Sequence, residues 1–188
     1  MRKIILLTLI CLSSNFISNA QPTPLLKDTV GVFYQKLEDS INKIVDDFPS
    51  NFNHIRGEKV ATHTFCSAWQ STANIPGFEH GIIFMEPGNS YEHWVYKALL
   101  ISSENRETTL NSYYDQYLKL RQIKLHCCVT QLSEDIDYLG DYNATWKTLM
   151  LHNDKDKAFK KLMINLRYHE STGSATSDVY LYIQSTDD

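Results

Sequence analysis

Histidines are the first residues to consider, because imidazole is the commonest metal ligand and an acid–base group near neutral pH. The chain has seven of them: His54, His63, His80, His93, His126, His152 and His169. None forms a His-Glu-x-x-His pair or another compact ligand pattern. His126-Cys127-Cys128 has metal-binding residue types, but consecutive residues of a strand point to opposite faces and do not converge on one ion. We therefore predict no metal site and no cofactor.

Cysteine thiols are the second reactive group. Of the four cysteines, Cys66, Cys127 and Cys128 lie beyond the N-terminal segment discussed below. In an oxidising compartment two thiols are expected to pair. Cys127 and Cys128 would diverge on a strand, so we expect one of them, not specified by the sequence, to bridge to Cys66. That bridge would close a loop of about sixty residues and contribute roughly 4 kcal/mol. A nucleophilic Cys66 is an open alternative.

Acidic clusters suggest glycoside hydrolysis, which uses two carboxyl groups at a fixed separation. Glu134, Asp135 and Asp137 form one cluster, and Asp46 and Asp47 form another. We interpret the first as an acidic loop and the second as a solvated helix face. No dinucleotide-binding glycine motif, P-loop or Gly-x-Ser-x-Gly sequence occurs. No catalytic residue is therefore predicted.

Aromatic residues give the clearest indication of binding. The chain has 11 tyrosines and 3 tryptophans, and such rings stack on sugars or anchor protein partners. Tyr180 and Tyr182 share one face of the last predicted strand, and Trp94 lies in another predicted strand. We predict these three residues as an aromatic binding face.

The elements that position these residues follow from hydrophobic periodicity. Residues 30–48 have an amphipathic helical pattern that is expected to bury Phe33, Leu37, Ile41, Ile44 and Phe48. A second helical pattern covers residues 110–123. Strand patterns occur at residues 60–69, 78–85, 91–102, 125–132, 146–152, 162–169 and 179–184.

Short turns between these strands favour antiparallel pairing. We predict an α+β fold: an antiparallel sheet of about six strands with the two amphipathic helices packed on one face. The order of helices and strands also fits a duplicated α-β-β-β unit.

The N-terminus has the three parts of a secretory signal peptide. Basic residues at positions 2 and 3 precede an apolar run over 4–12, and Ser18-Asn19-Ala20 supplies small residues before a cleavage site. We predict a signal peptide over residues 1–20 that is cleaved after Ala20, a mobile lead-in over 21–28, and a single α+β domain over 29–186. A lipid anchor on Cys11 and an uncleaved anchor are the alternatives.

Charge narrows the class of partner. The whole chain carries a net charge of −4, and loss of residues 1–20 removes two basic residues and gives −6. A mildly acidic surface argues against binding to nucleic acid. The mature chain has no apolar stretch long enough for a transmembrane helix. We expect a periplasmic or extracellular protein whose partner is a protein or a glycan.

One resemblance agrees with this location. Phe52-Asn53-His54-Ile55-Arg56-Gly57-Glu58, followed by Asn74-Ile75-Pro76-Gly77, resembles small exported proteins of Bacteroidota that have no assigned function. Asn19-Ala20-Gln21 is similar to cleavage sites of that group. The resemblance covers the first half of the mature chain and implies a source and a compartment, with no activity.

The sequence thus predicts an exported module that binds a protein or peptide. A carbohydrate-binding accessory protein and an unrecognised hydrolase are the alternatives. A cleft holding a titratable pair would favour the hydrolase, and a row of exposed aromatic rings would favour sugar or protein binding.

Overall fold

A computed structural model of the chain describes residues 24–60, 67–87, 92–128, 134–135, 148–149, 157–170 and 175–185. The chain divides into two compact units, Met1–Val32 and Phe33–Asp188. Helix α1 (Pro24–Asp46) begins in the first unit, so it includes part of the segment predicted as a mobile lead-in. The predicted signal peptide lies outside the described residues. No helix among the described residues is long and apolar enough to cross a membrane.

The second unit is built on a six-stranded antiparallel sheet, which confirms the predicted α+β fold class. Its strand order is β1-β2-β3-β4-β8-β7. The strands are β1 (Arg56–Val60), β2 (Ala68–Ser71), β3 (Ile82–Pro87), β4 (Glu92–Ser103), β7 (Leu162–Glu170) and β8 (Ser177–Ser185). β5 (Glu134–Asp135) and β6 (Thr148–Leu149) form a separate antiparallel pair. Within the described residues, helix α2 (Arg106–Leu120) is followed by this short pair and then by β7 and β8.

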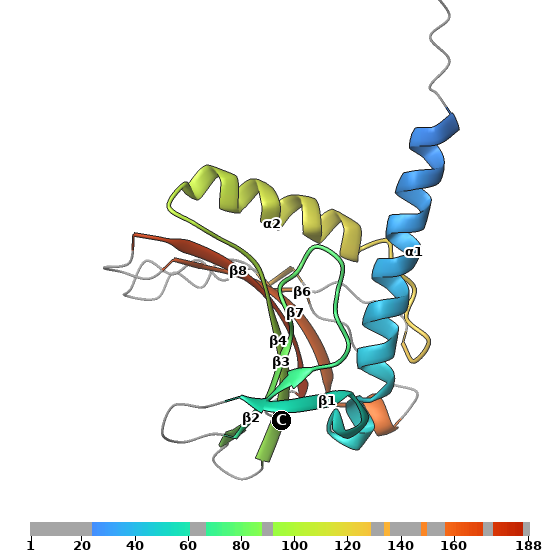
Figure 1. Cartoon of the computed structure of the whole chain (residues 1–188), viewed down its shortest axis with the longest axis vertical. Coiled ribbons are helices and arrows are strands. Elements are labelled where there is room, and N and C mark those ends of the chain that lie inside the picture. Colours follow the sequence, from blue (N-terminus) through green and yellow to red (C-terminus); the bar gives the residue numbers. More distant parts are fainter. Residues whose placement is uncertain are drawn as a thin grey trace, which may run out of the picture. The chain divides into compact units, whose positions relative to one another are not determined.

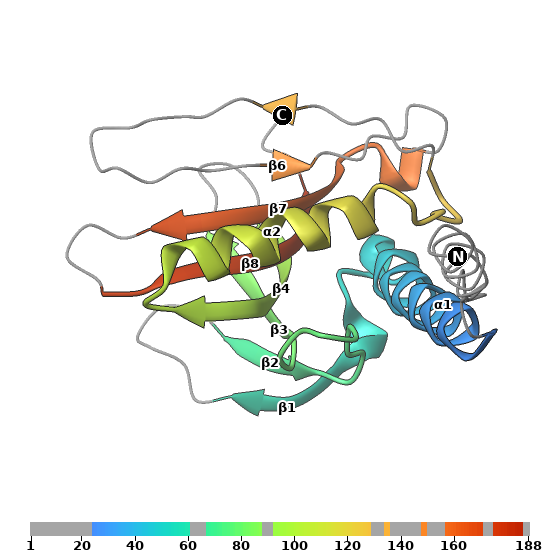
Figure 2. The same ribbon diagram turned by 90° about the horizontal axis from the view of Figure 1, so that it is seen from above.

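The hydrophobic core lies between one face of the sheet and the two helices (Figures 1 and 2). Strict alternation in β7 and β8 places every second side chain in this core, as the sequence pattern predicts. The fully buried members from these strands are Leu162, Ile164, Leu166, Tyr168, Val179, Leu181 and Ile183. Helix α2 (Arg106–Leu120) covers β4, β7 and β8. The later turns of α1 contribute Leu37, Ile41 and Ile44, each with no exposed surface.

Several predicted boundaries shift in the structure. α1 ends at Asp46, so Phe48 belongs to the short 3₁₀ helix η1 (Phe48–Ser50), where it is only partly buried. The first predicted strand, 60–69, corresponds to the end of β1 and the start of β2. None of residues 125–128 lies in a strand, and His126 and Cys127 form a bend, so the strand predicted at 125–132 is wrong over its described part. Residues 129–132 lie outside the described part of the chain.

A close approach between β3 and β4 requires one particular glycine. Gly81 lies against the ring of Tyr96, and a Cβ atom at position 81 would overlap that ring. Tyr96 has no exposed surface, and burial raises the pKa of its hydroxyl well above the ordinary value. The hydroxyl donates a long hydrogen bond of 3.4 Å to the carbonyl oxygen of Ala73. The tyrosine therefore occupies the space that any side chain at position 81 would need.

Candidate functional site

A pocket of about 240 Å³ opens where four segments that are distant in the sequence meet. η1 and its following turn supply one wall, and the 3₁₀ helix η3 (Lys157–Phe159) supplies another. Trp94 near the start of β4 and Ser185 at the end of β8 complete it. Its lining residues are Phe48, Pro49, Asn51, Trp94, Lys157, Ala158, Lys161 and Ser185. In Figure 1, η3 (orange) lies beside the turn that follows α1.

The wall formed by η1 is held in shape by the carboxylate of Asp47. This side chain is only 7% exposed. It accepts hydrogen bonds from the backbone N–H groups of His54 and Ile55, at 2.9 and 3.1 Å, and from the hydroxyl of Ser50 at 2.8 Å. It also pairs with Nδ1 of His54. Burial raises the pKa of Asp47, but these hydrogen bonds outweigh burial and hold the pKa below its usual value.

Two residues of the same turn adopt the left-handed conformation, which is uncommon outside glycine. Asn51 has φ 56° and Phe52 has φ 57°. Asparagine tolerates this region, whereas phenylalanine does so only when its surroundings compensate. The ring of Phe52 has no exposed surface and lies in the core near Phe48 and Tyr96. Core packing and the Asp47 hydrogen bonds thus fix the turn that presents Phe48 and Asn51 to the pocket.

Arg56 supports the aromatic side of the pocket. Its guanidinium carbon lies 3.5 Å from the ring centroid of Trp94 and 5.1 Å from that of Trp69, a cation–π arrangement. Its Nη2 donates a 2.6 Å hydrogen bond to the carbonyl oxygen of Asn51. Burial lowers the pKa of Arg56, and the carboxylate of Asp47 opposes that change, so the side chain remains charged. The cation therefore ties Trp94 to the Asn51 turn.

The rim of the pocket is cationic although the protein is acidic. Lys157 and Lys161 are both exposed and line the pocket, and Lys160 is an exposed neighbour outside the lining. Ammonium groups beside an aromatic ring and a proline suit a ligand with a carboxylate next to an apolar side chain. The pocket thus combines a charged rim with the aromatic and proline side chains of one wall.

A serine and a histidine also meet at this pocket. Nδ1 of His93 lies 2.8 Å from the hydroxyl oxygen of Ser185, which is within hydrogen-bonding distance. Ser185 lines the pocket. This distance is the one required between a nucleophilic serine and a general base.

The predicted aromatic face is divided by the structure. Tyr180 and Tyr182 point away from the core, because Val179, Leu181 and Ile183 point into it. Trp94 lies two residues before core residue Tyr96 and packs against the core instead. The three predicted residues therefore do not form one surface.

The side chains of Lys97 and Arg167 lie over the rings of the two tyrosines in cation–π contacts. Nζ of Lys97 lies 3.9 Å from the ring centroid of Tyr180 and 5.3 Å from that of Tyr182. The guanidinium carbon of Arg167 lies 4.4 Å from the ring centroid of Tyr182. Burial raises the pKa of both tyrosines and lowers that of Lys97. Cation–π contacts thus already cover part of these two rings.

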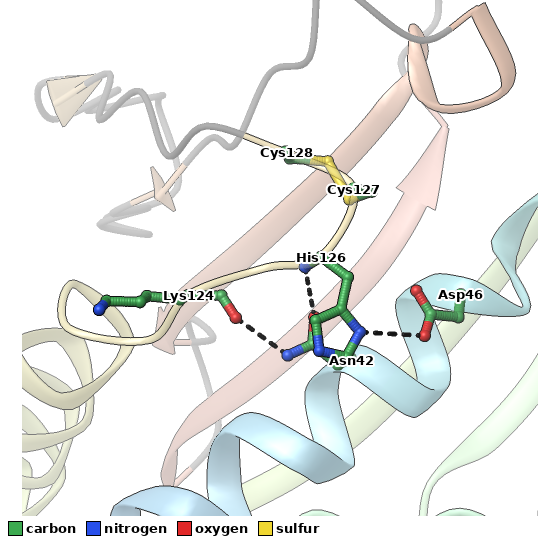
Figure 3. The surroundings of a disulfide bond; sticks show 6 residues. All are labelled: Asn42, Asp46, Lys124, His126, Cys127 and Cys128. Atoms are coloured by element: carbon green, nitrogen blue, oxygen red, sulfur yellow. Dashed lines mark hydrogen bonds and ion pairs between the residues drawn. A yellow bond between two sulfur atoms is a disulfide. The ribbon is translucent and has the colours of Figure 1, made fainter.

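The thiols pair differently from the prediction. Cys127 and Cys128 form a disulfide with each other, so neither sulfur is left for the expected bridge to Cys66 (Figure 3). The prediction assumed that both cysteines lie on a strand, where their side chains diverge. Instead Cys127 lies in a bend and Cys128 directly follows it, and the two side chains meet. Cys66 itself lies outside the described residues.

The other candidate groups do not converge. Among the described residues, no three His, Cys, Asp or Glu side chains are placed to hold a metal ion. Asp46 is half exposed and faces His126, whereas Asp47 is buried and faces His54, so they form no carboxylate pair. The cluster at 134–137 falls in β5 and beyond, where the structure describes only the backbone of β5.

Sequence reasoning missed the polar residues that organise the site. The helical pattern places Asp47 on a solvated face, yet its side chain is only 7% exposed and holds the turn after the helix. Asp47 is followed three residues later by Ser50, and such short polar side chains favour local turns over helix. That spacing was the available signal. Nothing comparable in the sequence joins Trp94 to residues 157–161.

Comparison of the chain with protein-family models finds no match, and comparisons with curated proteins and with solved structures find none either.

Proposed function

We propose that this chain is an exported binding module, and that the Trp94 pocket takes an acidic peptide segment of a partner protein. The observation that carries the proposal is the pocket itself, with Lys157 and Lys161 on the rim and Trp94 and Phe48 on the wall. The lysines would pair with carboxylates, and the rings would cover the apolar side chain beside them. The predicted signal peptide supplies the exported location.

The local charge of the pocket rim supports an acidic partner, although the overall charge of the chain opposes one. The mature chain is predicted to carry a net charge of −6, so its overall field repels an anionic peptide and any attraction has to be local. Each exposed ion pair contributes only about 0.2–1 kcal/mol, so two lysines account for an affinity change of roughly 2- to 30-fold. Binding to a single short peptide is therefore expected to be weak, with the aromatic contact adding to it.

The test uses capped Glu-Leu-Glu and Lys-Leu-Lys tripeptides as probes, titrated into the purified protein and followed by the indole N–H signal of Trp94. Glu-Leu-Glu is expected to shift that signal and Lys-Leu-Lys is not. A Lys157→Glu/Lys161→Glu variant should lose the response. Lys160→Glu makes the same change of charge at a residue that does not line the pocket, and this variant should keep the response. Equal responses to both peptides, or loss of binding in Lys160→Glu alone, would refute the proposal.

The His93–Ser185 hydrogen bond favours a second candidate function, a serine hydrolase acting on an ester or amide in the same pocket. His93 would accept the proton as Ser185 attacks a carbonyl carbon, and the lysines would stabilise the resulting oxyanion. A fluorophosphonate ester distinguishes the two candidates, because it modifies only an activated serine. Labelling that is lost in both Ser185→Ala and His93→Ala supports the hydrolase, and an unlabelled wild-type protein excludes it.

A further inference from the structure

The Cys127–Cys128 disulfide ends a segment that is fixed to α1. We call residues 121–128, which follow α2, the strap. Within the strap, Ile123 and Leu125 are buried in the core, and the two cysteines are partly exposed and pack at its border. The disulfide is therefore reachable from solvent on a segment that is otherwise anchored.

Polar contacts with α1 hold the strap (Figure 3). The buried amide of Asn42 donates to the carbonyl oxygen of Lys124 and accepts from the backbone N–H of His126, both at 2.9 Å. The carboxylate of Glu38 accepts from the N–H of Lys124 at 2.8 Å. The His126 ring faces the carboxylate of Asp46 at 3.4 Å. The contact at His126 lies directly before the two cysteines.

The disulfide does not act as an ordinary structural cross-link. A cross-link stabilises a fold mainly by closing a long loop in the unfolded chain, and the effect grows with loop length. Cys127 and Cys128 have a sequence separation of 1, so their bond closes the shortest loop possible. It joins no two elements of the fold. What it constrains is the backbone of these two residues, so it can be opened without releasing any part of the sheet or helices.

From the exposure, the position and the minimal loop we propose that Cys127–Cys128 is a reversible two-electron redox site whose substrate is a dithiol reductant. One thiolate of the reductant attacks Sγ of either cysteine and releases the other as a thiolate, giving a mixed disulfide. The second thiol of the reductant then displaces the bound cysteine. The reductant leaves as a cyclic disulfide, oxidised by two electrons, and both cysteines take up a proton. The proposal is independent of the Trp94 pocket.

Opening this bond should loosen the end of the strap. The oxidised pair fixes the backbone directly after the His126 N–H, which donates to Asn42. Two separate thiols allow that backbone more conformations, so the His126 hydrogen bond should open more often. The redox state of the disulfide is therefore expected to set how often the His126 hydrogen bond opens. The rate of amide hydrogen exchange at His126 then measures that redox state.

The test uses a Cys66→Ser variant of the full-length chain, purified without reductant. Alkylation before and after reduction, read by peptide mass spectrometry, assigns each thiol. We expect the peptide carrying Cys127 and Cys128 to be unalkylated and two hydrogen masses lighter than its reduced form. Dithiothreitol should open it while the protein stays folded, and removal of the reductant in air should close it. In the reduced state, the His126 amide should exchange about tenfold faster.

Two controls make the result decisive. Asn42→Ala should speed exchange of the His126 amide in both redox states, because it removes the acceptor itself. A Cys127→Ser/Cys128→Ser variant should exchange like the reduced protein and ignore dithiothreitol. Alkylation of both Cys127 and Cys128 in Cys66→Ser before reduction would overturn the proposal, since the two sulfurs would then not be joined to each other. So would a disulfide that dithiothreitol opens only after the protein unfolds.

Discussion

Replacing Asp47 by alanine should destabilise the protein by far more than is usual for a polar residue next to a helix end. The carboxylate accepts two backbone N–H groups, from His54 and Ile55, and two side-chain groups, from Ser50 and His54. Alanine leaves the Ile55 N–H unpaired in a buried setting, at a cost of about 1–3 kcal/mol. With the three other hydrogen bonds lost or passed to water, we expect a total of about 3–4 kcal/mol.

Two milder variants separate the contributions. Asp47→Asn keeps an oxygen for the backbone N–H groups and can turn its NH₂ toward His54, so it should cost only about 1–2 kcal/mol. His54→Ala removes one hydrogen bond from a side chain that is 76% exposed and should cost less than about 1 kcal/mol. The order Asp47→Ala, Asp47→Asn, His54→Ala is the prediction. Urea denaturation at pH 7 measures the three free energies of unfolding, and the comparison requires that their dependence on urea concentration has the same slope.

The pH dependence has a definite sign. The pKa of Asp47 is lower in the folded protein than its ordinary value of 3.8, so its stabilising effect is complete above that value. The effect is lost as the pH falls through the folded-state pKa, because the protonated acid accepts fewer hydrogen bonds. The advantage of wild type over Asp47→Asn should therefore shrink between pH 7 and pH 3. An Asp47→Ala variant as stable as His54→Ala, or an advantage unchanged at pH 3, would refute the account of this turn.

Two further predictions test the core. Gly81→Ala should destabilise the protein by about 3 kcal/mol or more, because the added Cβ overlaps the Tyr96 ring. Gly31→Ala should stabilise the protein by about 0.5–1 kcal/mol, because Gly31 is in a helix and its added Cβ meets no atom within 4 Å. Thermal unfolding of both variants checks this, and equal effects would contradict it. Leu37→Ala should cost about 2–5 kcal/mol in urea denaturation and Lys43→Ala almost nothing, because only the leucine is buried.

The parts of the fold that were predictable are those in which one periodicity runs without interruption. Alternation through 162–169 and 179–184 predicts β7 and β8 within one or two residues of their observed ends. The apolar stripe of α1 predicts the burial of Leu37, Ile41 and Ile44. In both cases a single buried face selects the side chains, so the pattern of residue types carries the information.

The candidate site could not be predicted in the same way. Its lining residues come from two 3₁₀ helices and from two strand ends, at positions between 48 and 185. Their meeting depends on the strand order, which places β8 beside β4 although about seventy residues separate them. No local pattern encodes that neighbourhood. The aromatic face failed for a related reason, since Trp94 shares the core side of β4 with Tyr96 and not the side of Tyr180.

The two disulfide assignments differ because of one local assumption about the backbone. If residues 125–128 were a strand, the side chains of Cys127 and Cys128 would point to opposite faces, and a partner elsewhere in the chain would follow. The strap is instead held on α1 by Asn42, a side chain that sits amid the polar residues of the helix and gives no sign of burial in the sequence. Asn42 fixes Lys124 and His126, the chain bends at His126 and Cys127, and the two thiols lie together. The choice of disulfide partner therefore depends on a buried amide on another element, which is why thiol assignment in Cys66→Ser tests the strap as much as the bond.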